Sequence, residues 1–361
     1  MASAELTTHE TPSTETLEKI LATIYGQVIG DAIGLLTEFL TKRECKLYYK
    51  TVAKELEYFH KVIVSDGHRT RWKDGDWTDD SDQMILIMRS LVDTNGKADC
   101  RDFATKLLGW VNKGFPDLGD VAGLGIGKTT LTVVRNPDYL KDPHAAAQLV
   151  WDSSQRNIAP NGAVMRTSFV GVHSYWNLLE VRQNALEYAK ITHYDPRCQA
   201  STVAVSVAIA TMIQGNHRDK KGKWKVKDII SEAYKLASEC LETEDQKKEL
   251  KFYLNCENIK KLQLDEERKI GYTYKSMGSG FWALKQDSFR KAITKIIMQG
   301  GDADSNACVA GAMLGCKLGL SALPEEWLSK LLHKEWLDTE IKKYFTMMKW
   351  DVHHSALDKS T

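Results

Sequence analysis

The sequence predicts a mostly α-helical protein, and two observations support this prediction. Apolar residues recur at the i, i+3, i+4 spacing of a helix along most of the 361 residues. Alternating, strand-like runs are few and short, and the best candidate is the run over residues 58–64. No Pro/Gly/Ser-rich linker and no internal repeat divides the chain.

Each predicted helix has its own apolar stripe. The first stripe contains Leu17, Ile20, Leu21, Ile24, Val28 and Ile29. The second contains Met84, Ile85, Met88 and Leu91. Similar patterns predict helices over residues 101–112, 144–151, 178–192, 199–214, 227–241, 282–298 and 305–319.

The composition excludes several classes of protein. The net charge is +1 and no basic stripe is present, so sequence-specific nucleic-acid binding is not expected. No apolar run is long enough to cross a membrane, and the first residues lack the layout of a signal peptide. The seven cysteines form no CxxC pair, which favours reduced thiols. We therefore expect a cytoplasmic protein, with the nucleus as the alternative.

Two predicted helices share a stripe of glycines. Gly26, Gly30 and Gly34 stand four residues apart in the first helix, and Gly311, Gly315 and Gly319 do so in the last. Residues four apart lie on one helix face, so each set would let another backbone approach closely. The alternative is that these glycines mark helix ends or bends. If the two helices pack together, Glu38 comes close to the acidic residues that begin the last helix.

Two acidic clusters stand far apart in the chain, and each runs into a helical pattern. They are residues 78–82, Thr-Asp-Asp-Ser-Asp, and residues 300–305, Gly-Gly-Asp-Ala-Asp-Ser. Hard cations such as Mg²⁺ and Mn²⁺ take oxygen ligands of this kind. Either cluster alone also suits a helix N-cap, but together they carry more acid than two caps need. The pair predicts the two halves of a binuclear metal site.

The loop at residues 122–129, Ala-Gly-Leu-Gly-Ile-Gly-Lys-Thr, nearly spells a phosphate-binding P-loop. A P-loop follows a buried strand and opens a helix, and the residues before this loop are not a strand. A nucleotide-binding phosphotransferase is therefore disfavoured, although exposed backbone N–H groups could contact a diphosphate in another manner. Asn161 follows Pro160 in a strong turn signal and could bind a sugar or a phosphate.

These segments match, in order, the motifs of the ADP-ribosylglycohydrolases, and the chain resembles that family over roughly residues 18–322. The paired TDD and GGDxD[ST] motifs are specific. The matching segments are residues 29–34 with Glu38, residues 77–83, the loop 123–130, residues 161–166, residues 192–193 and residues 300–305.

The resemblance implies an all-α, compact orthogonal helical bundle with two Mg²⁺ or Mn²⁺ ions at the base of an ADP-ribose cleft. It also implies a single domain over residues 16–350, between a disordered tail at 1–15 and a tail at 351–361. By motif position, the ligands of one ion would be Thr78, Asp79, Asp80 and Asp304. Those of the other would be Glu38, Asp302, the shared Asp304 and Ser305, where many relatives have Thr.

The resemblance further implies which residues contact the substrate. The residues expected to line the cleft are Gly125, Gly127, Asn161, Gly162 and His193. Residues 278–281 contact the adenosine side in relatives, so Gly280 and Phe281 are expected there. Some relatives carry an aromatic residue where this chain has Ala159, and Phe281 or Trp282 could replace it. Ordinary core packing is the alternative for both.

The activity implied is hydrolysis of the N- or O-glycosidic bond between ADP-ribose and a protein, nucleic acid or small molecule, with ADP-ribose as product. Glu38 or Asp302 would accept the proton of water, and the sequence does not choose between them. The carboxylate at Glu38 resembles the bacterial hydrolase and the serine-linked branch more than the eukaryotic arginine-specific branch, and this favours broader or O-linked specificity. The alternative function is a non-catalytic ADP-ribose-binding or crystallin-like member of the family.

Overall fold

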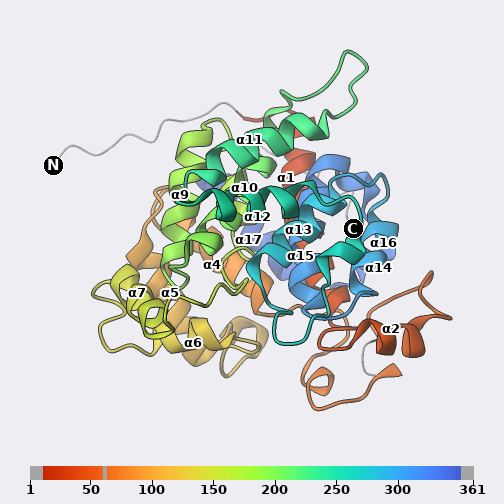
Figure 1. The fold of residues 1–361 in the computed structure, drawn as a ribbon, viewed down its shortest axis with the longest axis horizontal. Helices are drawn as coiled ribbons and strands as arrows, with labels where there is room; N and C mark the ends of the chain where they lie inside the picture. The colour runs from red at the N-terminus through yellow and green to blue at the C-terminus, as the bar shows by residue number, and fades with distance from the viewer. Residues whose placement is uncertain (1–10, 60–62, 351–361) are drawn as a thin grey trace.

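The computed structural model describes residues 11–59 and 63–350, and within these ranges it contains helices and no β-strand (Figure 1). The prediction of an all-α fold is confirmed. β-pairing among the described residues is confined to isolated bridges between Pro160 and Tyr272 and between Arg218 and Trp224. No helix among them is long and apolar enough to cross a membrane.

The α-helices are α1 (Thr14–Gly34), α2 (Lys42–Tyr49), α4 (Asp79–Asp93), α5 (Cys100–Lys113), α6 (Lys128–Val134), α7 (Pro143–Ser153), α8 (Ser168–Val172), α9 (Leu178–Lys190), α10 (Pro196–Gln214), α11 (Val226–Ser238), α12 (Glu244–Asn255), α13 (Thr273–Ala283), α14 (Phe289–Ile297), α15 (Ala303–Leu318), α16 (Glu325–Ser329) and α17 (Lys334–Met347). Short 3₁₀ turns are η1 (Arg69–Arg71), η2 (Pro116–Leu118), η3 (Ile259–Leu262) and η4 (Leu320–Ala322).

The centre of the molecule is the pair α1 and α15, which pack backbone to backbone. A Cβ atom placed on Gly30 would lie 2.0 Å from the carbonyl oxygen of Ala307, and one on Gly311 would lie 1.9 Å from that of Gly26. Both helices are buried on nearly every side, as expected of central helices. The predicted packing of the glycine stripes is confirmed for this face. Gly319 is the exception. It follows the last residue of α15 with φ +84°, and a Cβ atom placed on it would have no neighbouring atom within 4 Å.

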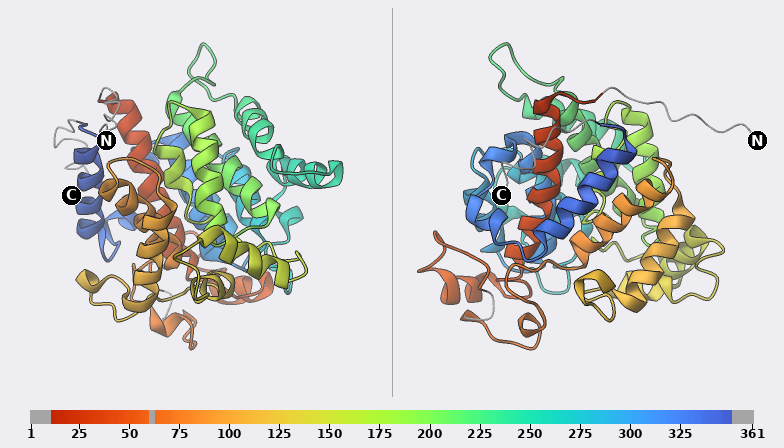
Figure 2. Two further views of the ribbon diagram at one scale, coloured as in Figure 1. Left: turned by 90° about the vertical axis from the view of Figure 1, so that its left-hand side faces the viewer. Right: turned by 180° about the vertical axis from the view of Figure 1, so that it is seen from behind.

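Other helices surround this pair. Helix α10 is also buried on almost every side, and α17 runs along α1 and α4 at the face seen from behind in Figure 2. The Arg89 side chain of α4 donates two hydrogen bonds to Glu340 of α17, at 2.7 and 3.1 Å. Tyr25 of α1 donates to Asp338 of the same helix. By contrast, α2 and its flanking loops project from one edge of the bundle (Figure 1).

Two sequence predictions about elements are wrong. The predicted helix over 282–298 is broken, because α13 ends at Ala283 and α14 begins at Phe289. Lys317 of α15 binds the intervening turn by donating to the Gln286 carbonyl at 2.6 Å and to Asp287 at 3.0 Å. The predicted strand over 58–64 is absent at residues 58, 59, 63 and 64, while residues 60–62 lie outside the described ranges.

The predicted tails fall largely outside the described residues, which exclude 1–10 and 351–361. Helix α1 begins at Thr14, inside the range predicted as a tail, because the Ser13 hydroxyl caps it by accepting the Thr16 N–H at 3.2 Å. The seven cysteines are free thiols, as predicted.

Candidate metal and substrate site

Asp31, inside the glycine stripe of α1, fixes the first acidic cluster. Its carboxylate accepts the backbone N–H and the hydroxyl of Thr78 at 3.1 and 2.9 Å, and those of Ser81 at 3.0 and 2.6 Å. These four bonds position the start of α4 against α1. Asp79 and Asp80, between the two anchored residues, line the cleft.

The second cluster begins with a glycine turn that also holds the segment carrying Glu38. Gly300 and Gly301 have φ +73° and +74°, a conformation that glycine adopts at low cost. The Gly301 carbonyl accepts the Phe39 N–H at 2.7 Å, and the Gly301 N–H donates to Leu40 at 2.8 Å. As a result, carboxylate oxygens of Glu38, Asp302 and Asp304 lie within 4.8 Å of one another.

The two clusters meet at one cleft of about 300 Å³. The packing of α1 on α15 was expected to bring Glu38 towards the second cluster, and Glu38 lines this cleft together with Asp302 and Asp304. The predicted site residues that line the cleft are Glu38, Asp79, Asp80, Gly125, Gly127, Asn161, Gly162, His193, Asp302, Asp304 and Ser305.

The carboxylates in this cleft are buried beyond what their hydrogen bonds compensate. Asp80 and Asp304 are 2% and 4% exposed, and one oxygen of each, Oδ2 of Asp80 and Oδ1 of Asp304, has no hydrogen-bond partner. Burial, followed by repulsion from neighbouring carboxylates, raises the pKa of Asp79, Asp80 and Asp304 well above the usual value. Buried charge of this kind is stable when it coordinates a cation, so this oxygen-rich donor set fits Mg²⁺ or Mn²⁺.

A buried chain of hydrogen bonds connects the first cluster to His193. Gln83 donates to Asp79 at 2.7 Å, and Arg166 donates to Gln83 at 2.8 Å and to the Thr192 hydroxyl at 2.8 Å. The Thr192 hydroxyl lies 2.7 Å from Nδ1 of His193. Burial, and then the charge of Arg166, lower the pKa of His193 well below its usual value. If Thr192 donates to Nδ1, the neutral imidazole carries its proton on Nε2, beside Gly162.

At positions 162 and 125 of the cleft wall, neighbouring side chains lie so close to the backbone that only glycine fits. A Cβ atom on Gly162 would lie 2.9 Å from Nε2 of His193, and one on Gly125 would lie 2.8 Å from Oδ1 of Asp79. Gly125 also has φ +95°. Gly127 caps α6, a helix of seven residues that follows a loop rather than a strand. The P-loop context is therefore absent here, as predicted.

Asn161 acts on a carboxylate of the cleft. Its amide nitrogen donates to Asp302 Oδ2 and to the Ser276 hydroxyl, both at 3.0 Å, while its backbone N–H donates to the Gly271 carbonyl at 2.9 Å. Asn161 thus orients Asp302.

Three predicted site residues are placed differently. Thr78 does not line the cleft: its hydroxyl caps α4 and donates to Asp31, so the capping interpretation accounts for its contacts. Gly280 packs against α15, where a Cβ would lie 2.5 Å from the Met313 sulfur, and Phe281 is fully buried. Gly280 and Phe281 do not line the cleft, because they pack in the core of the protein. Trp282 is buried in the core as well.

His68 and Phe39 were not among the predicted site residues. His68 Nε2 lies 2.5 Å from Glu38 Oε2, and its ring lies 4.8 Å from that of Phe39. Phe39 has φ +63° and is 56% exposed at the cleft. No local pattern marks either residue, since His68 reaches Glu38 only through the loop before η1.

A second cavity of about 570 Å³ adjoins the cleft and shares Thr129, Pro160 and Gly271 with it. Its other walls include Tyr272 and Arg197. The bridge between Pro160 and Tyr272 brings this tyrosine beside the Asn161 turn, next to Ala159.

The family model described as ADP-ribosylglycohydrolase matches residues 12–353. The chain belongs to the ADP-ribosylglycohydrolase family. Among its relatives, the ADP-ribosylarginine hydrolase Tri1 of Serratia proteamaculans (strain 568) is 25% identical over 93% of this chain and 81% of the relative. The ADP-ribosyl-[dinitrogen reductase] glycohydrolase of Rhodospirillum rubrum is 23% identical, over 90% and 94%.

A solved structure described as an ADP-ribosylglycohydrolase-related protein complex has the same fold as this member of the family. The TM-score is 0.67 at 20% identity, and the match covers 93% of this chain and 100% of that one. The predicted family and its helical fold are therefore confirmed.

Proposed function

We propose that this ADP-ribosylglycohydrolase family member is a dimetal-dependent hydrolase that releases ADP-ribose from an N- or O-glycosidic linkage on an ADP-ribosylated acceptor. The observation that carries the proposal is the meeting of both acidic clusters in one cleft with unpartnered buried carboxylate oxygens. The names of the two relatives above support the reaction class, since one is an ADP-ribosylarginine hydrolase and the other a glycohydrolase of ADP-ribosyl-[dinitrogen reductase].

The residues that would hold two Mg²⁺ or Mn²⁺ ions fall into two groups that share Asp304. Asp79 and Asp80, with Thr78 behind them, would serve one ion; Glu38, Asp302 and Ser305 would serve the other. Bound ions would neutralise these carboxylates and polarise the hydroxyls of the distal ribose and a water molecule. Of these residues, Thr78 is the least favoured as a metal ligand, because its hydroxyl already donates a hydrogen bond to Asp31.

Two carboxylates are candidates for accepting a proton from the attacking water. Without bound metal ions, burial raises the pKa of Glu38, and the contact with His68 opposes this shift. Asp302 is less buried and is held by Asn161. Since Glu38 is the more buried of the two and contacts a second titratable group, we assign it the role of base and Asp302 a supporting role.

The substrate would occupy both cavities. The distal ribose would lie at the acidic cleft, where the neutral His193 offers an N–H donor beside Gly162. The adenosine would lie in the adjoining cavity, where Tyr272 offers an aromatic face and Arg197 a cation for the diphosphate. Tyr272 thereby takes the stacking role that the sequence analysis considered for Phe281 and Trp282.

The test is release of free ADP-ribose from matched arginine-linked and serine-linked ADP-ribosyl peptides, with Mg²⁺, with Mn²⁺ and with EDTA. We expect metal-dependent release that is lost in Asp304→Asn, and the preferred peptide identifies the linkage. Tight ADP-ribose binding without release from either peptide would favour the non-catalytic alternative and contradict the hydrolase proposal for these linkages.

A further inference from the structure

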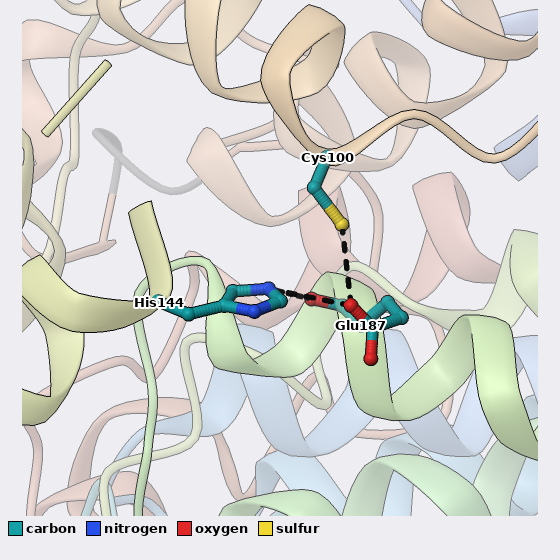
Figure 3. Close-up of side chains that lie close together, drawn as sticks. All are labelled: Cys100, His144 and Glu187. Carbon is teal, nitrogen blue, oxygen red and sulfur yellow. Dashed lines mark hydrogen bonds and ion pairs between the residues drawn. The ribbon is translucent and has the colours of Figure 1, made fainter. Parts of the chain in front are cut away.

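A second group of metal-ligating side chains lies outside the acidic cleft, where three helices meet (Figure 3). Cys100 is the first residue of α5, His144 is the second residue of α7, and Glu187 lies in the last turn of α9. One ligand atom from each lies within 4.8 Å of the other two. None of the three lines the cleft or the adjoining cavity.

The separations in this group are close to those of a tetrahedral zinc site. The Cys100 sulfur lies 3.7 Å from Oε2 of Glu187, and Nε2 of His144 lies 3.7 Å from the same oxygen. Zinc bonds of about 2.0–2.3 Å at tetrahedral angles place ligand atoms roughly 3.3–3.6 Å apart. Small side-chain movements would therefore bring all three atoms to one ion.

The Glu187 carboxylate is already oriented for such a role. Its Oε1 accepts hydrogen bonds from Lys190 at 2.9 Å and from Gln183 at 3.1 Å, so Oε2 faces the cysteine and the histidine (Figure 3). Outer contacts of this kind fix a ligating carboxylate. Nε2 of His144 also contacts the Glu187 carbonyl at 3.1 Å, and ligation would replace that hydrogen bond.

The surroundings allow an ion to enter. The side chains of His144 and Glu187 are 26% and 29% exposed, so solvent reaches the group and a water molecule can complete four-coordination. Burial and the nearby Glu187 raise the pKa of the Cys100 thiol to about 12. A bound cation would offset both effects, since coordinated thiols are deprotonated.

We propose that Cys100, His144 and Glu187 bind a Zn²⁺ ion at the junction of α5, α7 and α9. Sulfur and imidazole ligands favour zinc, whereas the oxygen-only cleft favours Mg²⁺ or Mn²⁺, so the two sites take different metals. The ion would tie down the end of α9, the helix that leads directly into Thr192 and His193.

The experiment uses Co²⁺ as a spectroscopic substitute for Zn²⁺, on the full chain with Mg²⁺ in excess. Only a cysteine ligand gives the thiolate-to-cobalt charge-transfer absorption in the near ultraviolet. We expect this band in the parent protein, its displacement by one equivalent of Zn²⁺, and its loss in Cys100→Ser. In Glu187→Gln and His144→Gln, we expect Zn²⁺ affinity to fall roughly 10- to 100-fold or more.

Two further cysteines provide controls. Cys240 is partly buried, as Cys100 is, but it belongs to no group of three potential metal ligands among the described residues, so Cys240→Ser should keep the band. Cys308 lies beside Asp80 of the acidic cleft. Its thiol could therefore bind a Co²⁺ ion in that cleft and produce the same absorption band. A band that survives Cys100→Ser and disappears in Cys308→Ala overturns the proposal, as does the absence of any band in folded parent protein.

Discussion

Asp304 illustrates how single residues carry the site. It is 4% exposed, one of its oxygens has no hydrogen-bond partner, and it lies within 4.8 Å of the ligand oxygens of Glu38 and Asp302. An isolated carboxylate is rarely left in this state, because burying a charge without compensation costs several kcal/mol. Under the proposed function, this arrangement would lower the stability of the metal-free chain and raise its affinity for cations.

Asp304→Asn should therefore separate activity from stability. We expect ADP-ribose release to fall by about two to three orders of magnitude, because a shared metal ligand is lost. In EDTA, we expect the unfolding temperature to rise, because a repelling charge is removed. Asp245→Asn, at a carboxylate 92% exposed, should change neither quantity. Undiminished activity in Asp304→Asn would contradict the proposed ligand set.

The buried carboxylates also predict a pH dependence of stability. Asp31 has its pKa raised by burial from 3.8 to about 7, and Glu38, Asp79, Asp80 and Asp304 also have raised values. A raised pKa means that the folded state binds more protons than the unfolded one, so stability falls as pH rises above about 4. In EDTA, denaturant unfolding should show the free energy of unfolding declining between about pH 4 and 7 or higher.

Excess Mg²⁺ should flatten this decline, since the cation replaces the protons as the compensating charge. The slope should also be smaller in Asp304→Asn, which lacks one of the titrating groups. If the EDTA-treated parent protein gained stability as the pH rose over this range, the buried carboxylates would have to be compensated by groups other than a metal.

At the scale of elements, the contact between α1 and α15 decides whether the site forms. The three glycines of α1 bring its backbone onto α15, and each helix leads into or out of an acidic segment. Gly30 is the tightest of the three, since a Cβ there would lie 2.0 Å from a carbonyl oxygen that has no freedom to rotate away.

Gly30→Ala should thus destabilise the protein by roughly 3 kcal/mol or more, by forcing the two helices apart. The matched control is Gly109→Ala in α5, where the added Cβ meets nothing within 4 Å and φ is ordinary. That change should stabilise the protein by about 0.5–1 kcal/mol, because alanine favours a helix over glycine. Equal effects of the two substitutions in chemical denaturation would exclude close packing as the reason for the glycine stripe.

Helices that depend on their own apolar period were predictable, whereas contacts made by distant residues were not. The stripe of α1 and the acidic starts of α4 and α15 are all readable from the sequence. The turn after Ala283 was missed because apolar residues continue on both sides of it and Lys317, a distant residue, holds it. For the same reason, the sequence did not predict the contact of His68 with Glu38 or that of Arg166 with Thr192, because each joins residues that are distant in the chain.

At the scale of the whole molecule, segments far apart in the sequence build two cavities that share lining residues. The Asn161 turn and the segment at Tyr272 meet at an isolated β-bridge, and both cavities share the residues around it. Under the proposed function, adenosine binding and the hydrolytic chemistry would lie in neighbouring cavities.

This division predicts different kinetic effects for different changes. Tyr272→Ala should weaken ADP-ribose binding about tenfold, the energy of one aromatic stacking contact, while leaving kcat nearly unchanged. Tyr272→Phe keeps the ring but loses the hydrogen bond to Glu249, 2.9 Å away, and should bind ADP-ribose normally. Calorimetric titration with ADP-ribose measures the affinity of each variant. If Tyr272→Ala bound ADP-ribose as tightly as the parent protein, adenosine would not lie in this cavity.

The packing of α1 on α15 has a consequence for synthesis of the protein. The ribosome synthesises Glu38, Asp79 and Asp80 before the acidic turn at residues 300–305, which follows them after ten further helices, α5 to α14. A chain that stops before residue 300 thus holds three of the five cleft carboxylates, Glu38, Asp79 and Asp80, and lacks the helix α15 that positions them. Catalytic competence would be acquired late and all at once, so enzyme activity would itself report that translation had run past the last acidic segment.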